Sequence, residues 1–258
     1  MKGRWILDKN VLKTSRSINS ITVSPSGDIS ISHERGIEVH SSSGEVKFKL
    51  DTESPYFMAI TVSADGMTYF MTNGTPFVTL YDVHGKYKRH WASPNSESNT
   101  TLYGLAMNAK DQVLVGDVAT GVSGTSSIHT HEQDGSHINT VTIPLTPHHL
   151  GATSKDTIIV CGFYDKSCPL IINKKGEILH TLKHPTAIFY CIISCYKDII
   201  LVTFRDKLHT YHAACYSESG AHLGNIPIYN VPCIALTGNG REAIVSTDSG
   251  YSTYKLKA

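Results

Sequence analysis

The chain has 258 residues, 17% of them charged, and 23 lysines and arginines nearly balance 22 aspartates and glutamates to leave a formal net charge of +1. This balance gives no overall attraction to nucleic acid or to an acidic membrane, so either would need a local patch. The longest weakly polar stretch, residues 187–196, is well short of the roughly 18 residues that a membrane helix needs. The N-terminal apolar run Trp5–Leu7 ends at Asp8 and Lys9, which excludes a signal-peptide core.

All six cysteines lie between Cys161 and Cys233, with irregular spacing. Neither the paired spacing of a structural zinc site nor the framework of a small disulfide-bonded domain is present. We therefore expect free thiols and a cytoplasmic location.

A repeated segment runs through the chain. Each copy has a short apolar run, a polar turn rich in Gly, Lys and Asp, and a second apolar run. The copies start 39 to 45 residues apart, at Ser20, Ala59, Gly104, His149, Cys191 and Cys233. A period of this size is typical of one blade of a β-propeller.

A second repeated segment carries glycine as its eighth residue, between two β-rich runs. The five copies place Gly44, Gly85, Gly135, Gly176 and Gly220 at this position. Glycine readily adopts the positive φ that tight hairpin turns require, so we expect a turn at each. Each unit then supplies four antiparallel strands, called a to d from the axis outward.

The sixth unit has no residues left for strand d, because the sequence ends at Ala258. Gly3–Leu7 resembles the strand d segments that begin at Gly85 and Gly176, so we expect the N-terminal segment to complete the last blade. Closure of the ring would leave no exposed edge at the seam. The sequence therefore predicts an all-β, six-bladed β-propeller with four-stranded antiparallel blades, and residues 1–258 as a single domain.

The units resemble the NHL repeat of the six-bladed propellers at the C-terminus of TRIM-NHL ubiquitin ligases. The matching pieces are Gly104-Leu105, Pro147 with Leu150, Ser63 to Gly66, Leu80 to Gly85 and Ile172 to Gly176. The Asn-His-Arg-Ile run that names the family is absent from every unit, so the chain would be a diverged member. WD-type repeats fit less well, because neither Trp5 nor Trp91 is followed by Asp.

The resemblance implies a recognition module for a protein substrate or for RNA, acting beside catalytic RING and coiled-coil parts of a ubiquitin ligase. This inference is an analogy, since a fold does not fix a function.

Two columns of residues precede strand a and point to a binding face. The inner column is Ser20, Ala59, Gly104, His149, Cys191 and Cys233, and five of these side chains are small, as convergence on an axis requires. The column before it is Asn19, Met58, Tyr103, His148, Tyr190 and Pro232. We expect this second column to surround the mouth of the channel on the top face, defined as the face that carries the d-to-a and b-to-c connections. Tyr103, His148 and Tyr190 are suited to stacking on peptide side chains or bases.

The same connections carry charged residues of both signs. The six cations are Lys13, Arg16, Arg35, Lys166, Arg205 and Lys207. The five carboxylates, which nearly balance them, are Glu34, Asp117, Asp165, Asp206 and Asp248. Binding of RNA through its backbone needs a basic stripe, so we favour a protein or peptide partner, with single-stranded RNA as the alternative. Neither DNA nor a membrane is expected. The candidate ligand-binding residues are Asn19, Met58, Tyr103, His148, Tyr190, Arg16, Arg35, Lys166, Arg205 and Lys207.

An enzymatic function would need a metal on the axis or an activated nucleophile. His148, His149, Cys191 and Cys233 offer a mixed nitrogen and sulfur set that suits zinc, but no carboxylate assists them. Gly121–Gly124 falls one residue short of a Gly-x-Ser-x-Gly elbow. We therefore expect no enzymatic activity, metal or cofactor, and a metal-dependent hydrolase is the least favoured alternative. The segment from Asp117 to Ser127 departs most from the repeat and is a candidate arm for partner contact.

Overall fold

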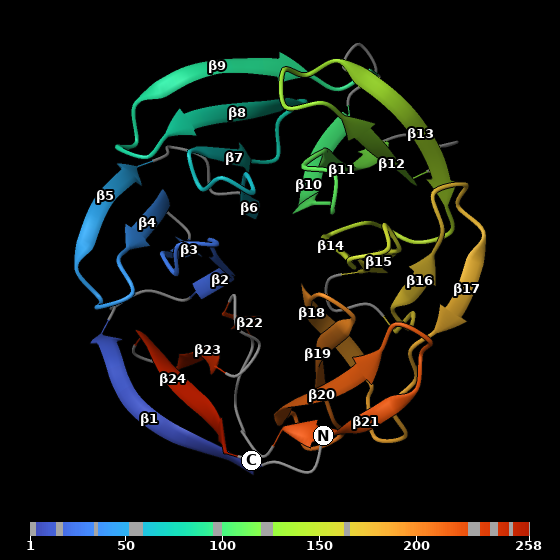
Figure 1. Ribbon diagram of the computed structural model, residues 1–258. Coiled ribbons are helices and arrows are strands. Elements are labelled where there is room, and N and C mark those ends of the chain that lie inside the picture. Colours follow the sequence, from blue (N-terminus) through green and yellow to red (C-terminus); the bar gives the residue numbers. More distant parts are fainter. Residues whose placement is uncertain are drawn as a thin grey trace.

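In the computed structural model the repeats fold into sheets arranged around a central axis (Figure 1). The structure describes residues 4–13, 18–33, 36–51, 59–94, 100–119, 126–162, 166–226, 233–237, 242–247 and 250–257. Across these ranges there are six sheets of four antiparallel strands. The predicted six-bladed propeller is confirmed.

The first three blades follow one another along the chain, each with its strands in order from the axis outward. Blade I contains β2 (Ile18–Val23), β3 (Ile29–His33), β4 (Gly36–His40) and β5 (Val46–Asp51). Blade II contains β6 (Ala59–Val62), β7 (Thr68–Thr72), β8 (Phe77–Asp82) and β9 (Tyr87–Ala92). Blade III contains β10 (Thr100–Met107), β11 (Val113–Ala119), β12 (Ser126–His131) and β13 (His137–Ile143).

The other three blades complete the ring. Blade IV contains β14 (His149–Ala152), β15 (Ile158–Cys161), β16 (Leu170–Ile172) and β17 (Ile178–Thr181). Blade V contains β18 (Phe189–Tyr196), β19 (Ile199–Arg205), β20 (Tyr211–Ser217) and β21 (His222–Ile226). Blade VI takes three strands from the end of the chain and one from its beginning, namely β22 (Ile234–Leu236), β23 (Glu242–Thr247), β24 (Gly250–Lys257) and β1 (Arg4–Lys13).

The seam of the ring is the pairing of β1 with β24. The two strands are antiparallel, with Arg4 opposite Lys257 and Lys13 opposite Gly250. Figure 1 shows β1 as the outermost strand of this blade. The predicted closure by the N-terminal segment is confirmed, and the strand extends beyond the expected Gly3–Leu7.

Apolar layers between neighbouring blades form the core. All positions of β3, β7 and β15 are buried, whereas every residue of the outer strand β17 is exposed. A sheet that is covered on both faces reads as a continuous apolar run, which explains the apolar runs of the repeat. The layer between blades I and II, for example, consists of Ile37, Val39, Phe48, Ile60, Val62, Tyr69 and Met71.

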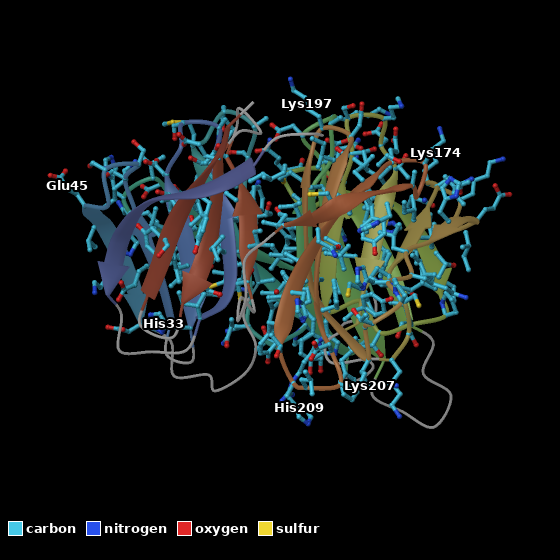
Figure 2. The ribbon with its side chains drawn as sticks, turned by 90° about the horizontal axis from the view of Figure 1, so that it is seen from below. His33, Glu45, Lys174, Lys197, Lys207 and His209 are labelled. Atoms are coloured by element: carbon cyan, nitrogen blue, oxygen red, sulfur yellow. The ribbon has the colours of Figure 1, made fainter. Side chains whose placement is uncertain are left out.

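The connections alternate between two faces of the ring. The five predicted turn glycines all have φ between 75° and 93°, so the turns between strands c and d are confirmed. Figure 2 shows Glu45, Lys174 and Lys197, from the c-to-d and a-to-b turns, on one face. On the other face, the top face, lie His33, Lys207 and His209, which adjoin b-to-c connections. No helix in the described ranges is long and apolar enough to cross a membrane.

Removal of residues 1–13 should destabilise the protein strongly. The deletion removes β1 and leaves β24 as an unpaired edge. With about 1 kcal/mol for each backbone hydrogen bond lost, the melting temperature should fall by roughly 10 °C or more. Deletion of residues 1–3, which keeps β1, is the control. Equal melting temperatures for the two truncated chains, measured by circular dichroism, would show that β1 does not close the ring.

Candidate functional site

A cavity of about 420 Å³ lies on the axis, where the innermost strands of all six blades converge. Many of the residues that line it are small or carry a hydroxyl group. They include Ser20, Thr22, Thr61, Gly151 and Ser194. A Cβ atom on Gly151 would overlap Sγ of Cys195 on the adjacent strand β18, so glycine permits the close approach of these two strands. No Lys, Arg, Asp or Glu is among the described residues that line the cavity.

The predicted inner column only partly faces this cavity. Ser20, Ala59 and His149 line it. Cys233 instead packs in the apolar layer between blades VI and I, and its Sγ donates a hydrogen bond to the carbonyl oxygen of Ile18 at 3.3 Å. The prediction that Cys233 faces the axis is therefore wrong. The side chain of Cys191 lies outside the described residues.

His149 is a buried imidazole at the wall of the cavity, with 6% of its surface exposed. Burial, with a smaller contribution from nearby His148, lowers the pKa of His149 to about 3. The ring is therefore neutral at pH 7, and the cavity wall has no charged group there. In the described part of the chain, no group of three or more His, Cys, Asp or Glu is placed to hold a metal ion.

Tyr103 lies against His148, which lines the cavity and belongs to the connection that precedes β14. Their ring centroids are 4.4 Å apart at an interplanar angle of 46°, and both side chains are partly exposed. Their backbones are held by the neighbouring blades, because Thr72 Oγ1 donates to the carbonyl of Tyr103 at 2.7 Å and Gly104 N donates to the carbonyl of Pro147 at 3.1 Å. The pair therefore forms a fixed aromatic surface on the top face.

Tyr190 does not belong to this surface. Its side chain is 3% exposed and packs in the layer between blades IV and V. The hydroxyl accepts a hydrogen bond from His184 N at 2.9 Å, and burial raises the pKa of Tyr190. The predicted place of Tyr190 in the exposed rim is wrong, because a register shift follows it before Ile193 and breaks the simple alternation along β18.

The other predicted ligand-binding residues are spread over the top face. Asn19 is partly buried in β2 at another register shift. Lys166 and Lys207 are exposed on the b-to-c connections of blades IV and V, and the Arg205 guanidinium lies 5.7 Å from the ring centroid of Tyr211. Three more predicted residues, Met58, Arg16 and Arg35, lie outside the described residues.

Asp117 was expected to be a surface charge, and this prediction is wrong because the residue is 2% exposed. Its Oδ2 accepts hydrogen bonds from Ser93 Oγ at 3.1 Å and from His129 Nε2 at 2.9 Å. The serine donates to the carboxylate and not to the imidazole, so this is not the order of a nucleophile and its base. Because Ser93 follows β9, the contact joins blades II and III. In the predicted arm, residues 117–119 and 126–127 belong to strands, and residues 120–125 lie outside the described ranges.

The opposite face is occupied by contacts between turns of neighbouring blades. Asp111 accepts a hydrogen bond from Ala64 N at 2.7 Å, and Asp198 accepts one from Ser154 Oγ at 2.6 Å. Lys110 and Asp156 form an ion pair at 3.2 Å. These side chains bridge turns of neighbouring blades and are therefore less available to a partner.

Comparison with known proteins shows the fold and no family. No family model matches the chain, and no curated protein matches it significantly. Among many solved structures that match is a chain from the crystal structure of a mitotic checkpoint complex. The TM-score is 0.67 at 16% sequence identity, and the match covers 99% of this chain and 91% of that chain. A likeness at this identity establishes a β-propeller, and the NHL family stays a prediction.

The buried imidazole of His149 should make stability depend on pH. The unfolded chain takes up a proton near pH 6.5 and the folded chain only near pH 3, so this contribution to stability is lost as the pH falls between these values. From pH 7 to pH 4.5 the cost is roughly 2 to 3 kcal/mol. His149→Gln should therefore lose less stability than the unmodified chain over this range, as measured by urea unfolding. His180→Gln, at an exposed position, is the control. The same pH dependence in all three proteins would contradict the prediction.

Proposed function

We propose that this chain is a non-catalytic recognition module that binds a protein or peptide through its top face. The observation that carries the proposal is the partly exposed pair of Tyr103 and His148, of which His148 also lines the axial cavity. Aromatic side chains that are already fixed lose little conformational entropy on binding, and they often dominate the energy of protein interfaces.

The chemistry of the axis supports recognition over catalysis. The described lining of the cavity offers hydroxyls and the neutral imidazole of His149 but no carboxylate to activate water or to hold a divalent cation. The buried set of Ser93, Asp117 and His129 lies between blades, with its hydrogen bonds directed at the carboxylate. Both features fit a structural or binding role.

The known proteins that the chain resembles point the same way. The similar propeller in the mitotic checkpoint complex is part of a protein assembly. The NHL-like repeat pattern adds a more specific proposal, in which the top face selects the substrate of a TRIM-NHL-type ubiquitin ligase in the cytoplasm. A single-stranded RNA ligand is the competing outcome of the test.

The test is a quantitative affinity purification from cells that express the protein. Three baits are compared by mass spectrometry: the unmodified chain, the double variant Tyr103→Ala with His148→Ala, and a control variant of the opposite face, Lys174→Ala with Lys197→Ala. Removing a side chain that contributes more than about 1 kcal/mol to the binding free energy reduces affinity about fivefold or more. We therefore expect co-purifying proteins to fall at least fivefold with the top-face variant and to persist with the control.

A nuclease step separates the two kinds of ligand. Proteins that contact the chain directly should persist after treatment with ribonuclease. If every protein that depends on the top face is lost with ribonuclease, RNA is the ligand. If no protein depends on Tyr103 and His148, the top face is not the binding surface.

A further inference from the structure

One part of the top face is basic. It consists of three connections in blades IV and V, residues 166–169, 182–188 and 205–211, which we call the IV–V sector. Leu182 N donates to the carbonyl of Pro169 at 2.8 Å, and Ile188 N donates to the carbonyl of Arg205 at 2.8 Å. The His184 ring also stacks on Phe204, with centroids 4.1 Å apart. The three connections therefore form one continuous surface.

The sector has more cationic than anionic side chains. It carries Lys166, Lys183, Arg205 and Lys207, against Asp206 and the neighbouring Asp165 of the sequence. In the described part of the chain no carboxylate forms an ion pair with these four cations. Near the opposite face, Lys47, Lys110 and Lys155 are paired with Asp28, Asp156 and Glu218, whereas Lys86, Lys174 and Lys175 form no ion pair among the described residues. The near-neutral balance expected for the whole top face does not hold in this sector.

Asp206 contributes one negative charge to the sector, and its oxygens organise the turn between β19 and β20. Its Oδ1 accepts hydrogen bonds from Leu208 N at 2.8 Å and Thr210 N at 2.9 Å, and its Oδ2 pairs with His212 Nε2 at 2.8 Å. The hydrogen bond from His212, the largest cause, lowers the pKa of Asp206. The carboxylate is therefore ionised and engaged within its own hairpin.

The ordered turn presents an apolar side chain at its tip. His209 N donates to the carbonyl of Asp206 at 3.1 Å, and His209 has φ of 62°, which closes the turn tightly. Leu208 is 83% exposed, the highest value among the large apolar side chains of the described residues. Figure 2 shows the flanking Lys207 and His209 projecting from this face. The apolar surface of this leucine is removed from water, with a favourable free energy, only when a partner covers it.

We propose that the IV–V sector binds an acidic segment of a partner protein, with a large apolar side chain of that segment seated against Leu208. The inference rests on the proposed function and names the chemistry of its partner. Unpaired cations favour Asp and Glu in the ligand, since complementary charges steer association and select the partner. An RNA strand would use the same cations but gains nothing comparable from Leu208. The combination of cations and an exposed leucine thus favours a peptide.

The probe for the test is a random 16-residue peptide library displayed on phage and selected against the immobilised full chain. Peptides that are enriched are synthesised with a fluorescein label and titrated by fluorescence polarisation. We expect sequences with several Asp or Glu residues around one large apolar residue. Their affinity should decrease as salt is raised from 50 to 300 mM.

Matched variants locate the binding surface. Charge reversal of the sector, Lys166→Glu with Lys183→Glu and Lys207→Glu, should weaken the selected peptides at least tenfold. Leu208→Ser should weaken them at least fivefold. The control, Lys86→Glu with Lys174→Glu and Lys175→Glu, reverses three exposed lysines on turns of the opposite face and should change affinity less than twofold.

The outcomes distinguish this inference from the proposed function. Peptides that lose affinity with Tyr103→Ala but not with the sector variants would overturn the inference and leave the proposed function standing. Peptides that respond to neither set, or a library without enrichment, would count against both. The same titration is made with a fluorescein-labelled 12-mer of oligouridylate. If this RNA binds and no peptide does, and if its affinity falls with the lysine variant but not with Leu208→Ser, the sector is an RNA surface and the inference is overturned.

Discussion

The fold depends on packing between neighbouring blades. Each sheet is covered on both faces by apolar layers, and such layers occur at all six junctions of the ring. A single blade could not bury both faces alone, so each is stable only beside its neighbours. The last blade must therefore pack on the first, and the pairing of β1 with β24 joins the two ends of the chain within one sheet. If blade VI did not pack on blade I, one apolar face of each blade would be exposed to water.

The same constraint determines the candidate site. Inner strands can converge only where side chains are small, and glycine at residue 151 allows β14 to approach Cys195 of β18. Beside His148, Gly104 and Gly116 leave room for the backbone of Pro147, because a Cβ atom on either would overlap the carbonyl oxygen of that proline. The next residue, His148, lies against Tyr103. The aromatic pair is thus a consequence of how closely blades III and IV pack, and it needs no flexible loop to position it.

The sequence allows the fold to be predicted well, because its strongest signals are local. A glycine between two β-rich runs indicates a turn with positive φ without reference to the rest of the chain, and all five positions agree. Side-chain direction at the start of strand a is not local. Register shifts occur near Ile18, Leu102 and Tyr190, and each changes which side chains face the core, so a column of equivalent positions can contain the accessible Tyr103 and the buried Tyr190. Charge counting failed for a related reason. Asp117 counts as a surface carboxylate in the sequence, whereas its histidine partner, His129, becomes a neighbour only in the folded sheet.

Two parts of the top face therefore offer different chemistry on a continuous scaffold. The pair of Tyr103 and His148, between blades III and IV, presents aromatic rings, whereas the IV–V sector presents cations and one exposed leucine. Since blade IV contributes to both, an extended ligand that follows the ring from Tyr103 toward Leu208 would meet an aromatic surface first and a basic surface second. Two linked contacts gain affinity because the second forms within an already bound complex. The rigid turn at Asp206 and the fixed pair at Tyr103 both reduce the entropy that such a ligand must overcome on binding. Specificity would then come from the order of apolar and acidic residues in the ligand, which is a property of a peptide sequence more than of a uniform nucleic-acid backbone.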